Sequence, residues 1–137
     1  MSRLTASVAA ALAFAAGTAA AQYATIEEAA WVRPDNATRF ESDSITKMGE
    51  MVRFDVTVGW EDASKRPEGE PVRKVIRYLA KCKEGEVAVA SVATFASTGI
   101  TPKTWGIAPG AWEFEKPEAG SLHARWLKRT CDSPLSW

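Results

Sequence analysis

The sequence predicts an α+β fold, a mainly antiparallel β-meander of about five to six strands with a C-terminal helix packed on one face. Apolar and polar side chains alternate over residues 51–58 and again over residues 72–82, as in strands with one buried face. Apolar residues recur at helical spacing after Ser121. The two cysteines, Cys82 and Cys131, fall on the second of these strands and on the helix, where a disulfide would join them.

An export leader is expected at the N-terminus. Arg3 precedes an apolar run over residues 4–16, and residues 19–21 are small alanines suited to cleavage before Gln22. A membrane anchor is the alternative, since residues 4–21 are nearly long enough to cross a bilayer. The stretch is mostly alanine and no second apolar span follows it, which favours cleavage.

Cleavage would remove a signal peptide of residues 1–21 and leave residues 22–137 as a single domain, periplasmic or secreted. No cysteine lies at the cleavage site, so we expect neither a lipoprotein nor a remaining transmembrane anchor. An oxidising compartment favours the Cys82–Cys131 disulfide, and closing a loop of about fifty residues would contribute roughly 4 kcal/mol. Two buried thiols would instead suit a reducing compartment. We expect no metal or cofactor, because two sulfurs and the single His123 fall short of four ligands.

The first half of the domain predicts antiparallel strands. Residues 37–41 and 44–50 suggest an edge strand and a glycine turn, forming a hairpin with residues 51–58. Residues 60–71 are polar and contain proline and glycine, as exposed loops do. In the strand over residues 51–58, the inward side chains are Val52, Phe54, Val56 and Val58.

Residues 72–82 form the next predicted strand, and a short turn at Glu84 and Gly85 leads into residues 86–95. The small and β-branched residues of this third strand are typical of a central position. A loop packed down by Trp105 is predicted over residues 101–110, followed by a last short strand over residues 111–115. One face of the strand over residues 72–82 carries Ile76, Tyr78, Ala80 and Cys82.

The C-terminal segment predicts an amphipathic helix. Ser121 is the expected N-cap, and Pro134 prevents a longer helix. A short helical turn is also predicted over residues 25–28, which match a capping box. The apolar stripe of the C-terminal helix comprises Leu122, Trp126, Leu127 and Cys131, and its polar side comprises His123, Arg125, Lys128 and Arg129.

Catalysis is not expected. The sequence has no nucleophile elbow, zinc-protease motif, phosphate-binding loop or dinucleotide fingerprint. Its one histidine, His123, falls on the polar side of the predicted helix, where a solvated or capping role is expected. Glu113 and Glu115 share a strand face, which is usually the wet side of a strand rather than an acid and base pair. We therefore predict that the protein is not an enzyme.

Six tryptophans invite an aromatic binding site. Trp60 borders the polar loop and Trp137 ends the chain, so these two are the better candidates for contact with a partner. The other four lie in apolar patterns that indicate packing: Trp31, Trp105, Trp112 and Trp126.

Basic side chains supply a second candidate surface. If the helix lies across the sheet, its cations would gather near those of the strand over residues 72–82, whereas scattered solubilising charge is the simpler alternative. Acidic and basic residues balance, 17 of each, which excludes the concentrated positive field of a nucleic-acid partner. The residues of this predicted patch are Arg77, Lys81, Arg125, Lys128 and Arg129.

The order of these features resembles the surface-adhesin protein E family of small bacterial envelope proteins. The resemblance rests on Trp31, residues 40–49 leading into a valine-rich strand, Cys82 at a strand end, Trp105 with residues 107–110, and Cys131. It implies an antiparallel sheet with a disulfide-fastened helix, and attachment to proteins such as laminin, vitronectin or plasminogen. It also implies a homodimer. The chain departs from the family in lacking a lipobox cysteine, which favours a periplasmic or released protein over surface display.

Two classes of function remain open. The first is a binding or adhesion module that meets another protein through its sheet and loops. The second is a small-molecule carrier or stress-related envelope protein with a pocket between helix and sheet. A closed apolar cavity under Trp126 would favour the carrier, and solid packing there with an open edge strand would favour the binding module.

Overall fold

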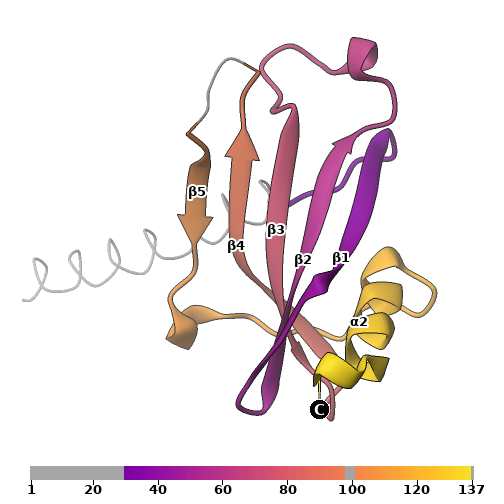
Figure 1. The fold of residues 1–137 in the computed structure, drawn as a ribbon, viewed down its shortest axis with the longest axis vertical. Coiled ribbons are helices and arrows are strands. Elements are labelled where there is room, and N and C mark those ends of the chain that lie inside the picture. The colour runs from indigo at the N-terminus through magenta and orange to yellow at the C-terminus, as the bar shows by residue number, and fades with distance from the viewer. Residues whose placement is uncertain (1–29, 98–100, 137) are drawn as a thin grey trace, which may run out of the picture.

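The computed structural model describes residues 30–97 and 101–136 of the 137-residue chain. They form one antiparallel sheet in the order β1-β2-β3-β4-β5 with a single α-helix, α2, packed against it (Figure 1), so the predicted meander and C-terminal helix are confirmed. The predicted leader and the turn over residues 25–28 lie outside the described residues. The strands are β1 (Asn36–Met48), β2 (Met51–Trp60), β3 (Arg73–Lys81), β4 (Glu86–Phe95) and β5 (Lys103–Gly106); the helices are η1 (Ala63–Lys65), η2 (Pro109–Ala111), α2 (Leu122–Asp132) and η3 (Pro134–Ser136).

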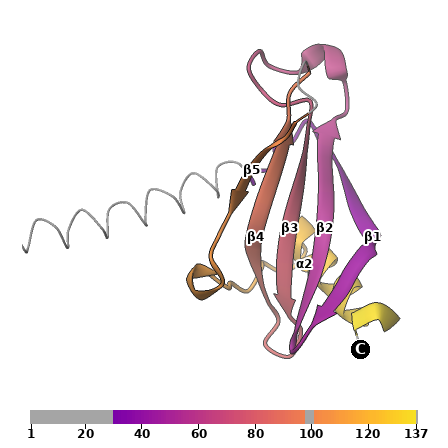
Figure 2. The same cartoon turned by 60° about the vertical axis from the view of Figure 1, so that its left-hand side comes forward.

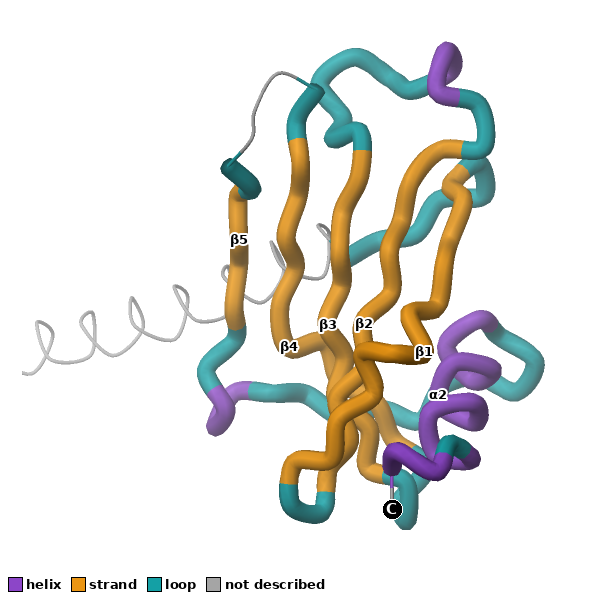
Figure 3. Tube along the Cα trace, in the orientation of Figure 1, coloured by secondary structure: helices purple, strands orange, loops and turns teal. Residues whose placement is uncertain are grey.

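One face of the sheet carries the core. Along β2, Phe54 and Val56 are fully buried while their neighbours Arg53 and Asp55 are half-buried, which is the predicted alternation. Each large apolar side chain buried in this way contributes about 1.5–3 kcal/mol. The strands lie in a single layer (Figure 3), and α2 lies against one side of it (Figure 2). The sheet therefore has one helix-bearing face and one face that α2 leaves uncovered.

β1 is one strand where the sequence suggested two pieces. Its pairing with β2 shifts between Glu41 and Thr46, which is a bulge. Within this bulge, the Ser44 hydroxyl donates to the Glu41 carbonyl (2.5 Å) and accepts from the Asp55 backbone N–H (2.7 Å). The hydroxyl thus replaces ladder hydrogen bonds that the irregular backbone loses, and Ile45 remains buried.

The segment after β4 differs from the prediction. A strand, β5, lies where a loop was predicted, and it pairs with β4 so that Trp105 sits opposite Val92. The strand predicted over residues 111–115 is wrong, because only Glu115 pairs with the sheet, through a single bridge to Val87. Pro109 begins η2 at this point, and the resulting turn carries residues 109–111 out of extended conformation.

The predicted cap and clamp of α2 are confirmed. The Ser121 hydroxyl accepts from the Ala124 N–H, and the helix ends at Asp132, ahead of Pro134. Cys82 and Cys131 form a disulfide with a Cα–Cα separation of 5.6 Å. Across residues 30–97 and 101–136, we find no helix with the length and hydropathy needed to cross a bilayer.

Candidate functional site

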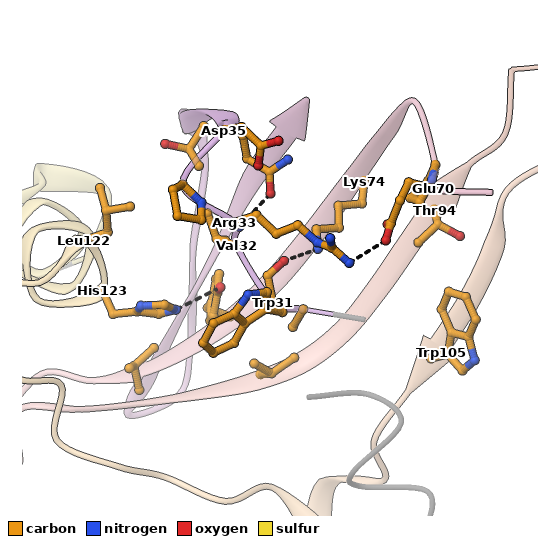
Figure 4. A pocket seen from close by; sticks show the side chains of 18 of the residues that line it. Trp31, Val32, Arg33, Asp35, Glu70, Lys74, Thr94, Trp105, Leu122 and His123 are labelled. Carbon is orange, nitrogen blue, oxygen red and sulfur yellow. Dashed lines mark hydrogen bonds and ion pairs between the residues drawn. The ribbon is translucent and has the colours of Figure 1, made fainter. Parts of the chain in front are cut away.

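An open groove of about 2230 Å³ lies on the helix-bearing face of the sheet (Figure 4). Its sides come from chain segments far apart in sequence: residues 30–36, the β2–β3 loop, β5, residues 113–118 and the first turn of α2. Tyr78 of β3 and Val87 and Val89 of β4 also line it. We call this hollow the concave groove. Because no single segment forms it, no local sequence pattern marks it.

Two tryptophans line the concave groove. Trp31 is 66% exposed, so the prediction that it is a packing residue is wrong. Trp105 is half-buried and packs against the core, as predicted. In the view of Figure 4, the Trp31 indole projects between His123 and Trp105. The groove thus offers an aromatic surface that no described part of the protein covers at Trp31.

An ionic network holds the segment that carries Trp31. The Arg33 guanidinium pairs with the Glu70 carboxylate at 2.5 Å, which ties this segment to the β2–β3 loop. The Lys74 ammonium donates to the Trp31 carbonyl. Burial lowers the pKa of Lys74, while the nearby Glu70 carboxylate opposes that shift. These contacts fix the backbone of this wall against β3 and leave the Trp31 indole exposed.

The wall formed by residues 113–118 is acidic. Glu113, Glu115 and Glu118 line the groove together with Lys116, and all four are exposed. The Glu115 backbone is anchored by two 3.0 Å hydrogen bonds, one in each direction, to Val87 of β4. None of the three carboxylates forms an ion pair within the part of the chain that the structure describes. This wall therefore presents unneutralised negative charge to the groove.

His123 occupies a different environment from the solvated one predicted. Its Nε2 lies 3.2 Å from the hydroxyl of Tyr78, and its ring centroid lies 5.0 Å from that of Trp126. Burial raises the pKa of the Tyr78 hydroxyl and lowers the pKa of the His123 imidazole, so both groups are held neutral. The helical pattern placed His123 on the polar side because it contains no information about the buried Tyr78 hydroxyl beneath the first turn of α2.

The candidate residues on the sheet do not line the concave groove and are engaged in other contacts. The Trp60 indole N–H donates to the Pro71 carbonyl at 2.8 Å, which closes the β2–β3 loop. Arg77 pairs with Asp55 at 3.0 Å, and Lys81 lies 4.1 Å from the centroid of the Phe114 ring. Hydrogen bonding to Asp55 raises the pKa of Arg77. These cations are thus bound to local partners.

The helical cations do not join Arg77. Because Arg77 alternates with Tyr78 along β3, and Tyr78 packs against Trp126 of α2, Arg77 lies on the opposite face of the sheet. On α2, Lys128 pairs with Asp132 at 2.7 Å. The Arg129 guanidinium lies over the Phe40 ring, and Arg125 is exposed. Trp137 lies outside the described residues.

Sequence reasoning did not identify the groove: it assigned Trp31 and Trp105 to packing and treated Glu113 and Glu115 as the solvated side of a strand. Arg33 pairs with Glu70 across 37 sequence positions, and Lys74 donates to the Trp31 carbonyl across 43, separations that no motif spans. The signal that was present is Trp31, a large aromatic near the predicted mature start. Among residues 30–97 and 101–136, no cluster of three or more histidine, cysteine or acidic side chains is arranged to hold a metal ion.

Comparison of the chain with protein-family models, with curated proteins and with solved structures gives no match. The resemblance to the surface-adhesin protein E family therefore stays a prediction. The geometry of the concave groove is the observation from which a function has to be argued.

Proposed function

We propose that the protein is a non-catalytic binding module that attaches to another protein through the concave groove, as a likeness to surface-adhesin protein E implies. The observation that carries this proposal is the open, tryptophan-lined groove itself. Pockets for small molecules usually enclose about 300–1,000 Å³ and bury most of their ligand. A groove of about 2230 Å³ that is open to solvent suits a segment of polypeptide better.

The packing under α2 supports a binding module over a carrier. Trp126 is 6% exposed, packs against Tyr78 and His123, and does not line the groove. Solid packing at this position was the feature expected of a binding module. The sheet also ends at β1 and β5, which pair with only one neighbouring strand each.

Export is part of the proposal. The Cys82–Cys131 disulfide suits an oxidising compartment, where such bonds form and persist. We place the mature protein, residues 22–137, in the periplasm or outside the cell after loss of residues 1–21. In either compartment it meets other envelope or extracellular proteins.

The test is solid-phase binding of the oxidised mature protein to laminin, vitronectin and plasminogen, beside an unrelated protein of similar charge. We expect binding to at least one of the three. Trp31→Ala should weaken it by roughly thirtyfold, as loss of an interface hot spot of about 2 kcal/mol does. Met48→Ala is the matched control, because Met48 is a large exposed apolar residue outside the groove.

No binding to any of the three proteins would remove the adhesin part of the proposal. Binding that both variants weaken equally, or that Trp31→Ala leaves unchanged, would show that the partner uses another surface. Circular dichroism of both variants serves as the folding control, since neither side chain is buried.

A further inference from the structure

We infer that the concave groove binds an extended peptide segment that carries a basic side chain and pairs with the backbone of residues 113–116. The inference rests on the proposed binding function and adds the chemistry of the partner. Three features of the groove carry it: a free backbone edge, an acidic wall and an exposed indole.

The free backbone edge lies beside β4. Glu115 directs both its N–H and its C=O toward Val87. In antiparallel pairing, the backbone groups of the residues on either side of such a bridge point the other way, so an extended chain here would turn those of Phe114 and Lys116 away from β4. Within the described residues, these groups form no backbone hydrogen bond. They are therefore positioned to pair with an added strand, as in β-augmentation.

The acidic wall favours a positive charge on the added peptide strand. Side chains of an extended peptide alternate between two sides, so every second one could lie beside Glu113 and Glu115, which both line the groove. Neither carboxylate has an ion-pair partner among the described residues, whereas the Arg33 guanidinium on the opposite wall is already paired with Glu70. A cationic side chain would neutralise this wall, and an anionic one would be repelled by it.

The Trp31 indole adds a third contact. It is largely exposed within the groove, and its backbone is held in place by Lys74. An indole face attracts a cation as well as apolar surface, so the same basic side chain, or its neighbour, would stack on it. A neutral sugar would also stack on Trp31, but it would not be attracted by the carboxylate charge. We therefore favour the peptide.

The experiment uses fluorescence anisotropy of the oxidised mature protein at low salt with four labelled probes. The first is a peptide of about six residues, the length of one strand, with lysines alternating with threonine and valine. The second has glutamate in place of each lysine, and the third is the lysine peptide with alternate backbone nitrogens methylated. The fourth is a neutral chito-oligosaccharide.

We expect the lysine peptide to bind and the other three probes to bind more weakly or not at all. Glu113→Gln combined with Glu115→Gln should weaken the lysine peptide by roughly fivefold, as loss of two exposed ion pairs would. Glu50→Gln combined with Glu84→Gln is the matched control, since both residues are exposed and lie outside the groove.

Equal binding of the lysine and glutamate peptides overturns the inference, and so does an unchanged affinity in the Glu113 and Glu115 variant. Preference for the oligosaccharide, or indifference to backbone methylation, overturns it as well. If a protein partner binds in a Trp31-dependent way but the lysine peptide does not, the peptide chemistry is wrong and the binding module stands. If neither binds, the proposed function fails too.

Discussion

The helix-bearing face of the sheet is buried in one part and open to solvent in the other. Under α2, Tyr78 and Trp126 are buried in contact with each other, and a disulfide ties the helix to the end of β3. Toward β5, the same face is open, and Trp31 is 66% exposed. We call the first part the clamped part; the second is the concave groove. The difference teaches that a small domain can bury one part of a sheet face for stability and leave the other part open to solvent.

Removing the disulfide should have the largest effect on the stability of the clamped part. Its two cysteines are 49 positions apart, and a loop of that length corresponds to roughly 4 kcal/mol of the free energy of unfolding. Cys82→Ser combined with Cys131→Ser should therefore lower the melting temperature by roughly 15 °C. Calorimetry of the oxidised protein, the reduced protein and the double variant measures this change. A small drop would show that packing alone holds α2 on the sheet.

Substituting one tryptophan in each part compares their contributions to the free energy of unfolding directly. Trp126→Ala should lower the free energy of unfolding by about 3 kcal/mol, because it leaves a cavity beside Tyr78. Trp31→Ala should change it by less than about 0.5 kcal/mol, because that indole is exposed. Urea denaturation followed by circular dichroism measures both. Similar losses in the two variants would contradict the assignment of stability to the clamped part.

The clamped part could be predicted from sequence, and the groove could not. The alternation in β2 and the helical stripe around Trp126 are local patterns, each contained in about ten residues, so they mark buried faces directly. β5 escaped prediction because it has only four residues, follows Pro102 and ends in Gly106, so it resembles a loop. Antiparallel pairing with β4, from Ser91 opposite Gly106 to Thr94 opposite Lys103, makes them a strand.

The groove depends on contacts between distant segments. Arg33 meets Glu70 through a loop whose path the sequence does not specify, and the wall at Glu115 arises from a single bridge to Val87. His123 was misplaced for a similar reason. A helical pattern classifies residues only as apolar or polar, so it placed His123 toward solvent. The partner of its side chain is the buried Tyr78 hydroxyl on β3.

His123 belongs to both parts, as Tyr78 does, because it lines the groove and packs on Trp126. Burial lowers the pKa of its imidazole below the ordinary value of 6.5. The unfolded chain therefore takes up a proton first as pH falls, so the free energy of unfolding should decrease below about pH 6.5. Above that pH the stabilisation is fully present.

His123→Gln tests this smallest effect, since glutamine cannot be protonated yet can still form a hydrogen bond with the Tyr78 hydroxyl. Urea denaturation between about pH 7.5 and 5.5 should show a decrease for the native sequence and a flatter profile for the variant. This window lies above the ordinary titration range of the carboxylates. Identical slopes would mean that protonation of His123 leaves the Tyr78 contact intact, and the clamped part would then be insensitive to charge at its boundary with the groove.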